Sequence, residues 1–211
     1  MFKLTRFVTG PLDVNTYVCY DDETKKCFIV DPSEWMYIKG YINEHHLCCT
    51  HILITHGHFD HILCVAKLKD DLNAKVCIHK DDAESLYTDK INLSVFCGIE
   101  MNGHCKADII LNDGDSIICA GKTIKVLHTP GHSKGSVCYI IEDEHIIFSG
   151  DTLFNMGIGR TDLYYSDSKA LNNSIKKLYS LKDNYAVLPG HGEFTELSYE
   201  KINNPFTKDM V

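Results

Sequence analysis

The stretch THGHFDH, residues 55–61, most constrains what this chain can fold into. It follows the apolar run ILI, which has the composition of a buried strand. Alternate residues of an extended segment point the same way, so His56 and His58 can share one ion. Asp60 and His61 lie just beyond, where a second ion could bind. Imidazole nitrogen and carboxylate oxygen are the usual ligands of catalytic zinc, so the stretch predicts a metal site at a strand end.

Three other apolar runs end in the same way. KVL leads into HTPGH, IIF into SGDT and AVL into PGHG, so each is followed by a glycine and a ligand-type residue. Glycine lets the backbone turn sharply and approach an ion closely. Four strand ends on one rim would gather seven ligand-type side chains: His56, His58, Asp60, His61, His132, Asp151 and His191. Seven ligands exceed one tetrahedral ion but suit two ions that share a carboxylate.

Length and charge set the class of protein. A chain of 211 residues with 44% hydrophobic and 24% charged residues is expected to form one soluble domain, residues 1–211. The net charge of −8 counts against a nucleic-acid partner. No apolar run reaches membrane-spanning length, and the start lacks the apolar core of an export signal. We therefore expect a cytoplasmic enzyme with a small-molecule partner, whose oligomeric state the sequence does not indicate.

Ten cysteines could suggest disulfides or a zinc finger, but their spacing favours neither. No C-x-x-C motif occurs, and the only close pair is the adjacent Cys48–Cys49. Several cysteines lie inside apolar, strand-like runs, where a free thiol behaves as a small hydrophobic side chain: Cys27, Cys77, Cys119 and Cys138. We expect reduced, structural cysteines.

The remaining pattern predicts an α/β fold. Strands are expected at residues 2–8, 15–20, 26–30, 52–54, 75–79, 109–111, 116–119, 122–127, 137–141, 146–148 and 186–188. Helices are expected from an N-cap at Ser33 towards His45, and at residues 62–72, 81–87, 168–181 and 197–202. Residues 88–105 read as an irregular crossing. Two groups of strands, each followed by helices, indicate two face-to-face sheets with helices outside.

The motifs THGHFDH, TPGHS, FSGDTLF and LPGHG, in this order, resemble the metallo-β-lactamase superfamily. Within it the chain is most similar to the short bacterial-type form of the glyoxalase II (hydroxyacylglutathione hydrolase) branch, without the C-terminal helical domain. The resemblance runs from about Phe2 to Phe206 and implies a four-layer αββα sandwich with two mixed β-sheets. It also implies one metal ion on His56, His58 and His132, a second on Asp60, His61 and His191, and Asp151 bridging them.

Such a centre implies hydrolysis at neutral pH. Two divalent ions, most simply zinc but also iron or manganese, would lower the pKa of a bridging water enough to supply hydroxide. Asp60 could orient that hydroxide while the ions polarise the substrate carbonyl. A thioester suits this apparatus because its thiolate, with a conjugate pKa of about 8.5, leaves without a strong general acid. The expected substrate is a small thioester such as S-lactoylglutathione.

Three residues are candidates for substrate contacts. In the resemblance, Arg160 falls where glyoxalase II enzymes place a basic contact, and a guanidinium there could hold a carboxylate bidentately. The alternative is an internal tether from Arg160 to Asp162 that shapes the loop. Lys134 and Tyr139 are weaker candidates, because on their own they fit a surface and a core position.

Other functions are also compatible with these motifs. A mononuclear-iron persulfide dioxygenase would share the GRTD loop but use fewer of the seven ligands, and a lactonase would use the same two ions on an ester. A nuclease, a β-lactamase and a non-catalytic metal-binding module are disfavoured. Among the other histidines, His45, His46, His104 and His145 should be exposed. Backbone or outer-layer hydrogen bonds are expected for His51, His79 and His128.

Overall fold

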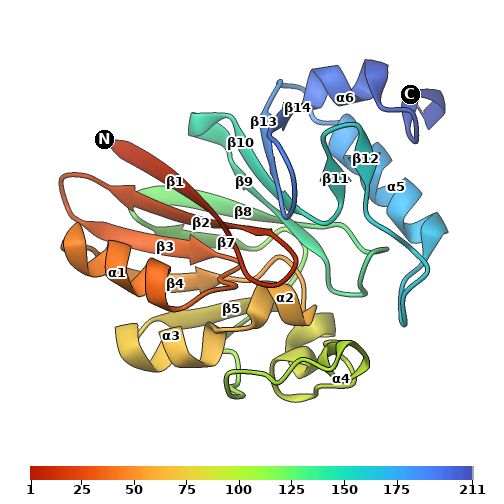
Figure 1. Ribbon diagram of the computed structural model, residues 1–211. Helices are drawn as coiled ribbons and strands as arrows, with labels where there is room; N and C mark the ends of the chain where they lie inside the picture. Colours follow the sequence, from red (N-terminus) through yellow and green to blue (C-terminus); the bar gives the residue numbers. More distant parts are fainter. Residues whose placement is uncertain (211) are drawn as a thin grey trace.

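The two groups of strands form two six-stranded sheets in the computed structural model, which describes residues 1–210 (Figure 1). The first sheet has the order β1-β2-β3-β4-β5-β6, antiparallel as far as β3 and parallel from there on. Its strands are β1 (Phe2–Thr9), β2 (Val14–Asp21), β3 (Lys26–Val30), β4 (Cys48–Leu53), β5 (Lys75–His79) and β6 (Ile109–Leu111).

The second sheet has the order β14-β13-β10-β9-β8-β7 and is also mixed, because only β10 and β13 run parallel. Its strands are β7 (Ser116–Cys119), β8 (Lys122–His128), β9 (Val137–Ile141), β10 (Ile146–Gly150), β13 (Ala186–Pro189) and β14 (Thr195–Glu196). A separate small hairpin joins β11 (Leu153–Phe154) to β12 (Gly157–Ile158).

Helices cover the outer faces of the two sheets (Figure 1). On the first sheet, Ile38 of α1 (Met36–Glu44) and Leu68 of α3 (Val65–Leu72) are buried against the strands. On the second, Leu171 and Ile175 of α5 (Ser168–Tyr179) pack with Val187. The other helical segments are α2 (Phe59–Ile62), the 3₁₀ turns Lys80–Tyr87, Glu142–Glu144 and Lys208–Met210, α4 (Ser94–Cys97) and α6 (Leu197–Asn203). This is the expected αββα sandwich.

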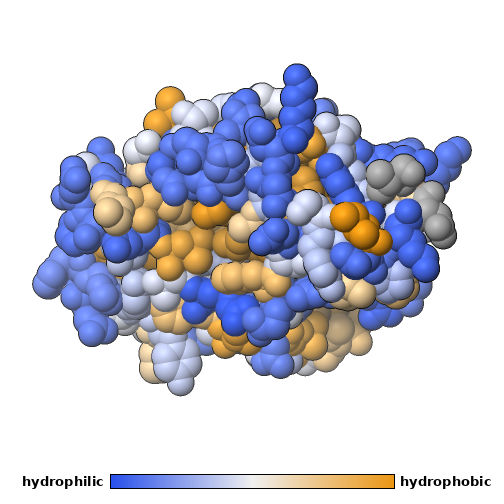
Figure 2. Space-filling model, turned by 90° about the horizontal axis from the view of Figure 1, so that it is seen from above, coloured by the Kyte–Doolittle hydropathy of each residue, from blue (hydrophilic) through white to orange (hydrophobic). Residues whose placement is uncertain are grey.

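The core between the sheets is built from large aromatic and aliphatic side chains. Phe148 of β10 lies with its ring centroid 5.2 Å from that of Tyr17 and 6.3 Å from that of Phe28. Central strands buried on both faces read as continuous apolar runs in sequence, as β3 and β9 do here. From above, the surface is mostly hydrophilic around a central apolar band (Figure 2).

The structure corrects two expected helix boundaries. Ser33 is not an N-cap: it is buried, its backbone N–H donates to Thr16 Oγ1 at 3.2 Å, and α1 begins at Met36. The helix expected at residues 62–72 consists of α2 and α3, so helical structure already begins inside the histidine stretch. The two-residue strands β11, β12 and β14 were not predicted, because two residues show no periodicity.

Other expectations are confirmed. Residues 88–105 are irregular apart from the single turn of α4. All ten cysteines are free thiols, and the four expected inside strands are buried: Cys27, Cys77, Cys119 and Cys138. Over residues 1–210, no helix has the length and apolar character needed to cross a membrane.

Candidate metal centre

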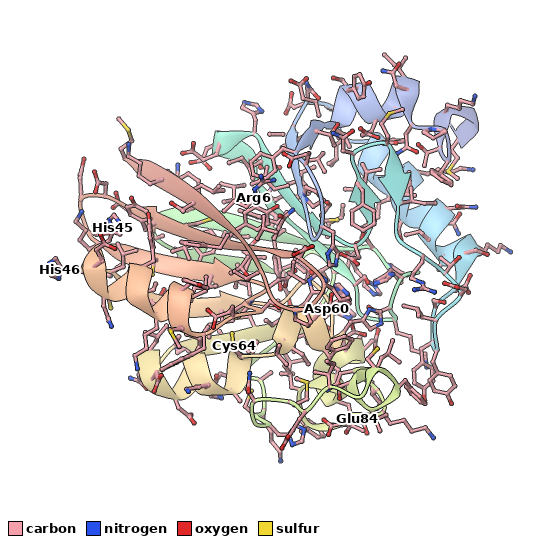
Figure 3. All side chains as sticks on the ribbon, viewed as in Figure 1. Arg6, His45, His46, Asp60, Cys64 and Glu84 are labelled. Carbon is pink, nitrogen blue, oxygen red and sulfur yellow. The ribbon has the colours of Figure 1, made fainter. Side chains whose placement is uncertain are left out.

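The seven predicted ligands follow four strands whose ends meet at one edge of the sandwich. After β4 of the first sheet come His56, His58, Asp60 and His61, and after β8, β10 and β13 of the second come His132, Asp151 and His191. Asp60 lies where the ends of the two sheets approach each other (Figure 3). Both sheets therefore contribute to the site.

The three residues of the first group are buried. His56, His58 and His132 each present one nitrogen, and the three nitrogens lie within 4.8 Å of one another. His58 Nδ1 is 2.9 Å from His132 Nε2. His56 Nε2 has no hydrogen-bond partner among the described residues although it is inaccessible to solvent. Burying an unpaired nitrogen is costly, so this atom is suited to receive a ligand.

The second group combines one carboxylate with two imidazoles. Asp60 Oδ2 lies 3.4 Å from His61 Nε2 and 3.3 Å from His191 Nε2. The two Nε2 atoms are 3.2 Å apart. Asp60 and His61 are buried, and the side chain of His191 is 27% exposed, so this group is open on one side.

Asp151 lies between the two groups and contacts both. Its Oδ2 is 3.5 Å from His132 Nε2 in the first group and 3.5 Å from His191 Nε2 in the second. Its Oδ1 is 3.5 Å from His61 Nε2 and has no hydrogen-bond partner among the described residues. One carboxylate thus reaches both groups of nitrogens.

The donor geometry fits divalent cations. Donor atoms about 2.0–2.1 Å from a tetrahedrally coordinated ion lie about 3.3 Å from one another. The contacts of Asp60 and Asp151 with the imidazole nitrogens are 3.3–3.5 Å long. The nitrogens that face one another cannot all carry protons, and a shared cation satisfies every lone pair at once. The residues present therefore match the ligand chemistry of zinc and related metals.

Outer hydrogen bonds fix how the imidazoles are turned. Three rings donate from Nδ1 to oxygen atoms outside the centre. His61 donates to the Asp31 carboxylate at 2.9 Å. His132 donates to the Arg160 carbonyl at 3.0 Å, and His191 to the Leu12 carbonyl at 2.9 Å. Carbonyl and carboxylate oxygens only accept, so each Nδ1 carries a proton and each Nε2 is the ring nitrogen that faces the site.

Two buried aspartates that sequence reasoning missed organise these loops. Asp31 accepts from Thr55 N at 2.8 Å as well as from His61. Asp82 accepts from Gly57 N at 2.9 Å and from Gly135 N at 2.7 Å, and so ties two ligand loops together. Asp31 follows the apolar β3 as the ligands follow their own strands, and that signal could have found it. Asp82 lies three residues after β5, but no glycine follows that strand, so the pattern that selected the ligands did not select Asp82.

The charges within the centre shift several pKa values. Burial alone would lower the pKa of His61, but the carboxylates of Asp60, Asp151 and Asp31 outweigh it and raise that pKa to about 10. Burial opposes ionisation of Asp60 as well, yet the neighbouring imidazoles, His61 foremost, hold the pKa of its carboxyl well below the usual range. Burial lowers the pKa of His56, which stays neutral and available as a ligand.

Cross-sheet hydrogen bonds lock the ligand loops in place. Tyr139 Oη donates to the Ile54 carbonyl at 2.8 Å, just before the histidine stretch, and Tyr17 Oη donates to the Pro189 carbonyl at 2.7 Å, just before His191. Tyr139 is fully buried and lines no cavity at the site, so the substrate contact expected of it is wrong. Its hydroxyl is used to join β9 to the end of β4.

A glycine brings two strand ends into contact. A Cβ at Gly190 would collide with Asp151 Oδ1 and would crowd the ring of His61 at 2.7 Å. A glycine is therefore required for the backbone after β13 to approach the candidate bridging carboxylate.

A cavity of about 400 Å³ opens beside the predicted ligands. His58, Asp60, His132, Asp151 and His191 form its floor. Much of the remaining lining is an apolar wall made of Leu12, Leu93, Phe154, Ile158 and Leu163. The cavity therefore presents a polar floor with an apolar surface around it.

Of the predicted substrate contacts, only Arg160 lines this cavity. Its guanidinium donates from Nε to Asp162 Oδ1 at 2.7 Å and from Nη2 to Oδ2 at 2.8 Å, so the tether weighed from the sequence is present. Lys134 lines a smaller cavity of about 140 Å³ on the other side of His58. Its Nζ lies 4.0 Å from the ring centroid of Tyr165.

Two of the three histidines expected to make backbone hydrogen bonds do so. His128 donates from Nε2 to the Lys134 carbonyl at 2.9 Å, and His79 Nδ1 accepts from Asp81 N at 3.3 Å. The two rings stack with centroids 4.0 Å apart. His51 differs from the expectation, because its Nδ1 lies 2.9 Å from a side-chain oxygen, Thr50 Oγ1. Four histidines are exposed, as predicted: His45, His46, His104 and His145.

Comparison with known proteins places this geometry in a family. The family model described as metallo-beta-lactamase superfamily matches residues 9–191. A probable metallo-hydrolase of Bacillus subtilis, YqgX, is 37% identical over 97% of this chain and 97% of its own length. The hydroxyacylglutathione hydrolase GloC of Haemophilus influenzae is 32% identical over 91% of this chain and 92% of its own.

Solved structures agree in fold. The BLEG-1 B3 metallo-beta-lactamase superposes with a TM-score of 0.91 at 36% identity, covering 98% of this chain and 99% of that one. TTHA1623 in a di-iron-bound form gives a TM-score of 0.85 at 33% identity, covering 96% and 99%. The matched motifs, the αββα sandwich and the converging ligands lead to one conclusion: the chain belongs to the metallo-β-lactamase superfamily.

Proposed function

We propose that the protein is a dinuclear-metal hydrolase that cleaves small thioesters. The observation that carries this proposal is the position of Asp151, whose carboxylate lies 3.5 Å from a nitrogen of each ligand group. A carboxylate shared in this way is what two adjacent cations require. In the proposal, His56, His58 and His132 hold one ion, Asp60, His61 and His191 hold the other, and Asp151 bridges them.

Divalent cations bound here would polarise a substrate carbonyl and lower the pKa of a bound water. Asp60 contributes as a carboxylate that remains ionised at neutral pH and lines the cavity, so it can accept a hydrogen bond from the attacking water. The backbone carbonyls that hold His132 and His191 keep these rings fixed during the reaction.

A thioester is favoured over an amide by the leaving group. A thiolate, with a conjugate pKa of about 8.5, departs without prior protonation, whereas an amine does not. The one cationic side chain of the lining other than the imidazoles is Arg160, and a guanidinium does not release a proton at neutral pH. The likeness to a hydroxyacylglutathione hydrolase supports the same choice.

Metal analysis and thiol release test the proposal together. Protein loaded with zinc, iron or manganese should hold two ions per chain and release free thiol from S-lactoylglutathione. The likeness to a structure in a di-iron-bound form supports two ions, and zinc is the first metal to test. Protein that binds two ions and cleaves no thioester above background would contradict the proposal.

A second candidate is the mononuclear-iron persulfide dioxygenase. The three histidines of the first group together with Asp151 would suffice for one ion. One iron per chain with oxygen uptake on a persulfide would favour it over hydrolysis. The same assays should include a lactone and a β-lactam, because the likeness to the BLEG-1 B3 metallo-beta-lactamase weighs against dismissing β-lactams from the sequence alone.

A further inference from the structure

The charge of the cavity bears on which thiol the substrate carries. Among the described residues of its lining, Arg160 is the one charged side chain outside the predicted ligands. Asp162 takes two of the N–H groups of that guanidinium, and both side chains are largely exposed, at 63% and 68%. The rim of the cavity therefore carries an ion pair with no net charge, and a substrate carboxylate would have to share the guanidinium with Asp162.

The other nearby cation lies in a cavity that also contains carboxylates. Lys134 lies across His58 in the smaller cavity, whose lining includes the carboxylates of Asp81, Asp82 and Glu84. Its Nζ is placed over the ring of Tyr165. A negatively charged thiol arm, meaning the part of the substrate attached to the sulfur, would meet more carboxylates than ammonium groups if it turned to this side. On neither side of the predicted ligands do cations outnumber carboxylates, once the Arg160–Asp162 pair is counted.

The remaining contact surface for a thiol arm is apolar. When the thioester carbonyl reaches the floor, groups several bonds away lie against the wall, which Leu93, Ile158 and Leu163 help to form. Glutathione carries two carboxylates and one ammonium group at that distance. Placing a carboxylate against an apolar surface without a partner is unfavourable, whereas alkyl and neutral amide groups lose little.

We infer that the preferred substrate is a thioester of an uncharged thiol, such as a short chain ending in a neutral amide, rather than of glutathione. This inference rests on the proposed thioester hydrolysis at the same site. The reaction is the same in each case: water adds across the carbonyl–sulfur bond, the carbon–oxygen bond forms, and the thiolate leaves and takes up a proton. Only the recognition of the arm differs.

Three thioesters with one acyl group test the inference. Lactoyl thioesters of glutathione, of N-acetylglutathione diethyl ester and of N-acetylcysteamine are compared with the metal-loaded protein, and each kcat/KM is divided by the uncatalysed hydrolysis rate of that compound. The N-acetyl diethyl ester keeps the cysteine thiol and removes both carboxylates and the ammonium charge. We expect both neutral-ended arms to exceed glutathione by about tenfold, the effect of an unpaired carboxylate at this wall.

A pair of variants locates the effect. Asp162→Asn releases the Arg160 guanidinium and should raise kcat/KM for the glutathione thioester about threefold, with the N-acetylcysteamine thioester unchanged. Asp143→Asn is the matched control: it removes the same charge from an exposed carboxylate that pairs with Lys122, in the turn between β9 and β10. It should change neither substrate.

The outcomes are distinguishable. Glutathione thioester cleaved as well as or better than both neutral compounds would overturn the inference and leave thioester hydrolysis standing. An equal gain in Asp162→Asn and Asp143→Asn would overturn the assignment to the Arg160–Asp162 pair, because overall charge would then explain the preference. Cleavage of none of the three thioesters would remove the proposed function and this inference with it.

Discussion

The floor and the wall of the cavity are built in different ways. The seven predicted ligands, five of which form the floor, follow strands of the two main sheets. Hydrogen bonds of 2.9–3.0 Å hold the outer nitrogens of His61, His132 and His191. Wall side chains come from turns and short elements: Leu12 precedes β2, and Ile158 ends the two-residue β12. The floor is therefore fixed by the sandwich, whereas the wall can vary without disturbing it.

This difference assigns separate roles to the two parts. A rigid floor determines which metals and which reaction the protein supports, and the wall determines which molecules reach it. Substitutions in the floor should change metal content and kcat together. Substitutions in the wall should change KM with the metal content intact.

The largest effect is expected from removing a floor ligand. His58→Ala takes away the nitrogen 2.9 Å from His132 Nε2 and should lower kcat/KM on the order of 10³-fold with loss of bound metal. Metal analysis and thiol release measure both quantities. His104→Ala, at an exposed histidine, is the control. Full activity in His58→Ala would break the assignment of the floor to metal binding.

A backbone change under the floor should act almost as strongly. Gly190→Ala places a methyl group against Asp151 Oδ1 and the ring of His61, so one ligand must move. We expect about a 10²-fold loss of kcat/KM and weaker metal binding, measured by titration with a chelator. Gly40→Ala in α1, where an added Cβ meets nothing within 4 Å, should leave both unchanged. Equal behaviour of the two variants would show that the close approach is unimportant.

The layer behind the floor should affect stability as well as activity. Asp82→Ala leaves Gly57 N and Gly135 N without their buried acceptor, which should lower the free energy of unfolding by about 2–4 kcal/mol. Urea denaturation measures this loss. Asp81→Ala, at the exposed neighbour, should change it by less than about 0.5 kcal/mol. An unchanged urea midpoint of unfolding in Asp82→Ala would show that the hydrogen bonds from Gly57 N and Gly135 N do not stabilise the ligand loops.

The smallest effect is expected in the wall. Ile158→Ala removes apolar contact surface and should raise KM about threefold to tenfold, with kcat within about twofold and metal content unchanged. Steady-state kinetics on a neutral thioester measure KM and kcat, and metal analysis measures the metal content. Loss of bound metal in Ile158→Ala would contradict the separate roles assigned to the floor and the wall.

The same division explains what the sequence could predict. Each predicted ligand lies one to eight positions beyond an apolar strand, so the repeated strand-end pattern selected all seven. The grouping of strands and helices, together with the family resemblance, indicated the sandwich. Asp82 and the wall residues Leu12 and Leu93 lie in turns and irregular segments, where neighbours in sequence do not indicate neighbours in space. Arg160 had two interpretations, because only the fold decides whether Asp162 faces it.

The role of Tyr139 could not be predicted from the sequence. In sequence it is one aromatic residue of an apolar strand, compatible with a core position or a cavity wall. The structure buries it fully and uses its hydroxyl to join the two sheets. That role depends on the carbonyl of Ile54, a partner more than eighty positions away, which no local pattern indicates.

Each ligand group takes donors from loops of both sheets, so bound cations would cross-link the two halves of the sandwich. Anything that binds only the folded chain shifts unfolding by mass action. The chain's resistance to heat and to proteases should then rise and fall with the concentration of free divalent metal around it. A low concentration of metal would shorten the lifetime of the folded protein as well as abolish its activity.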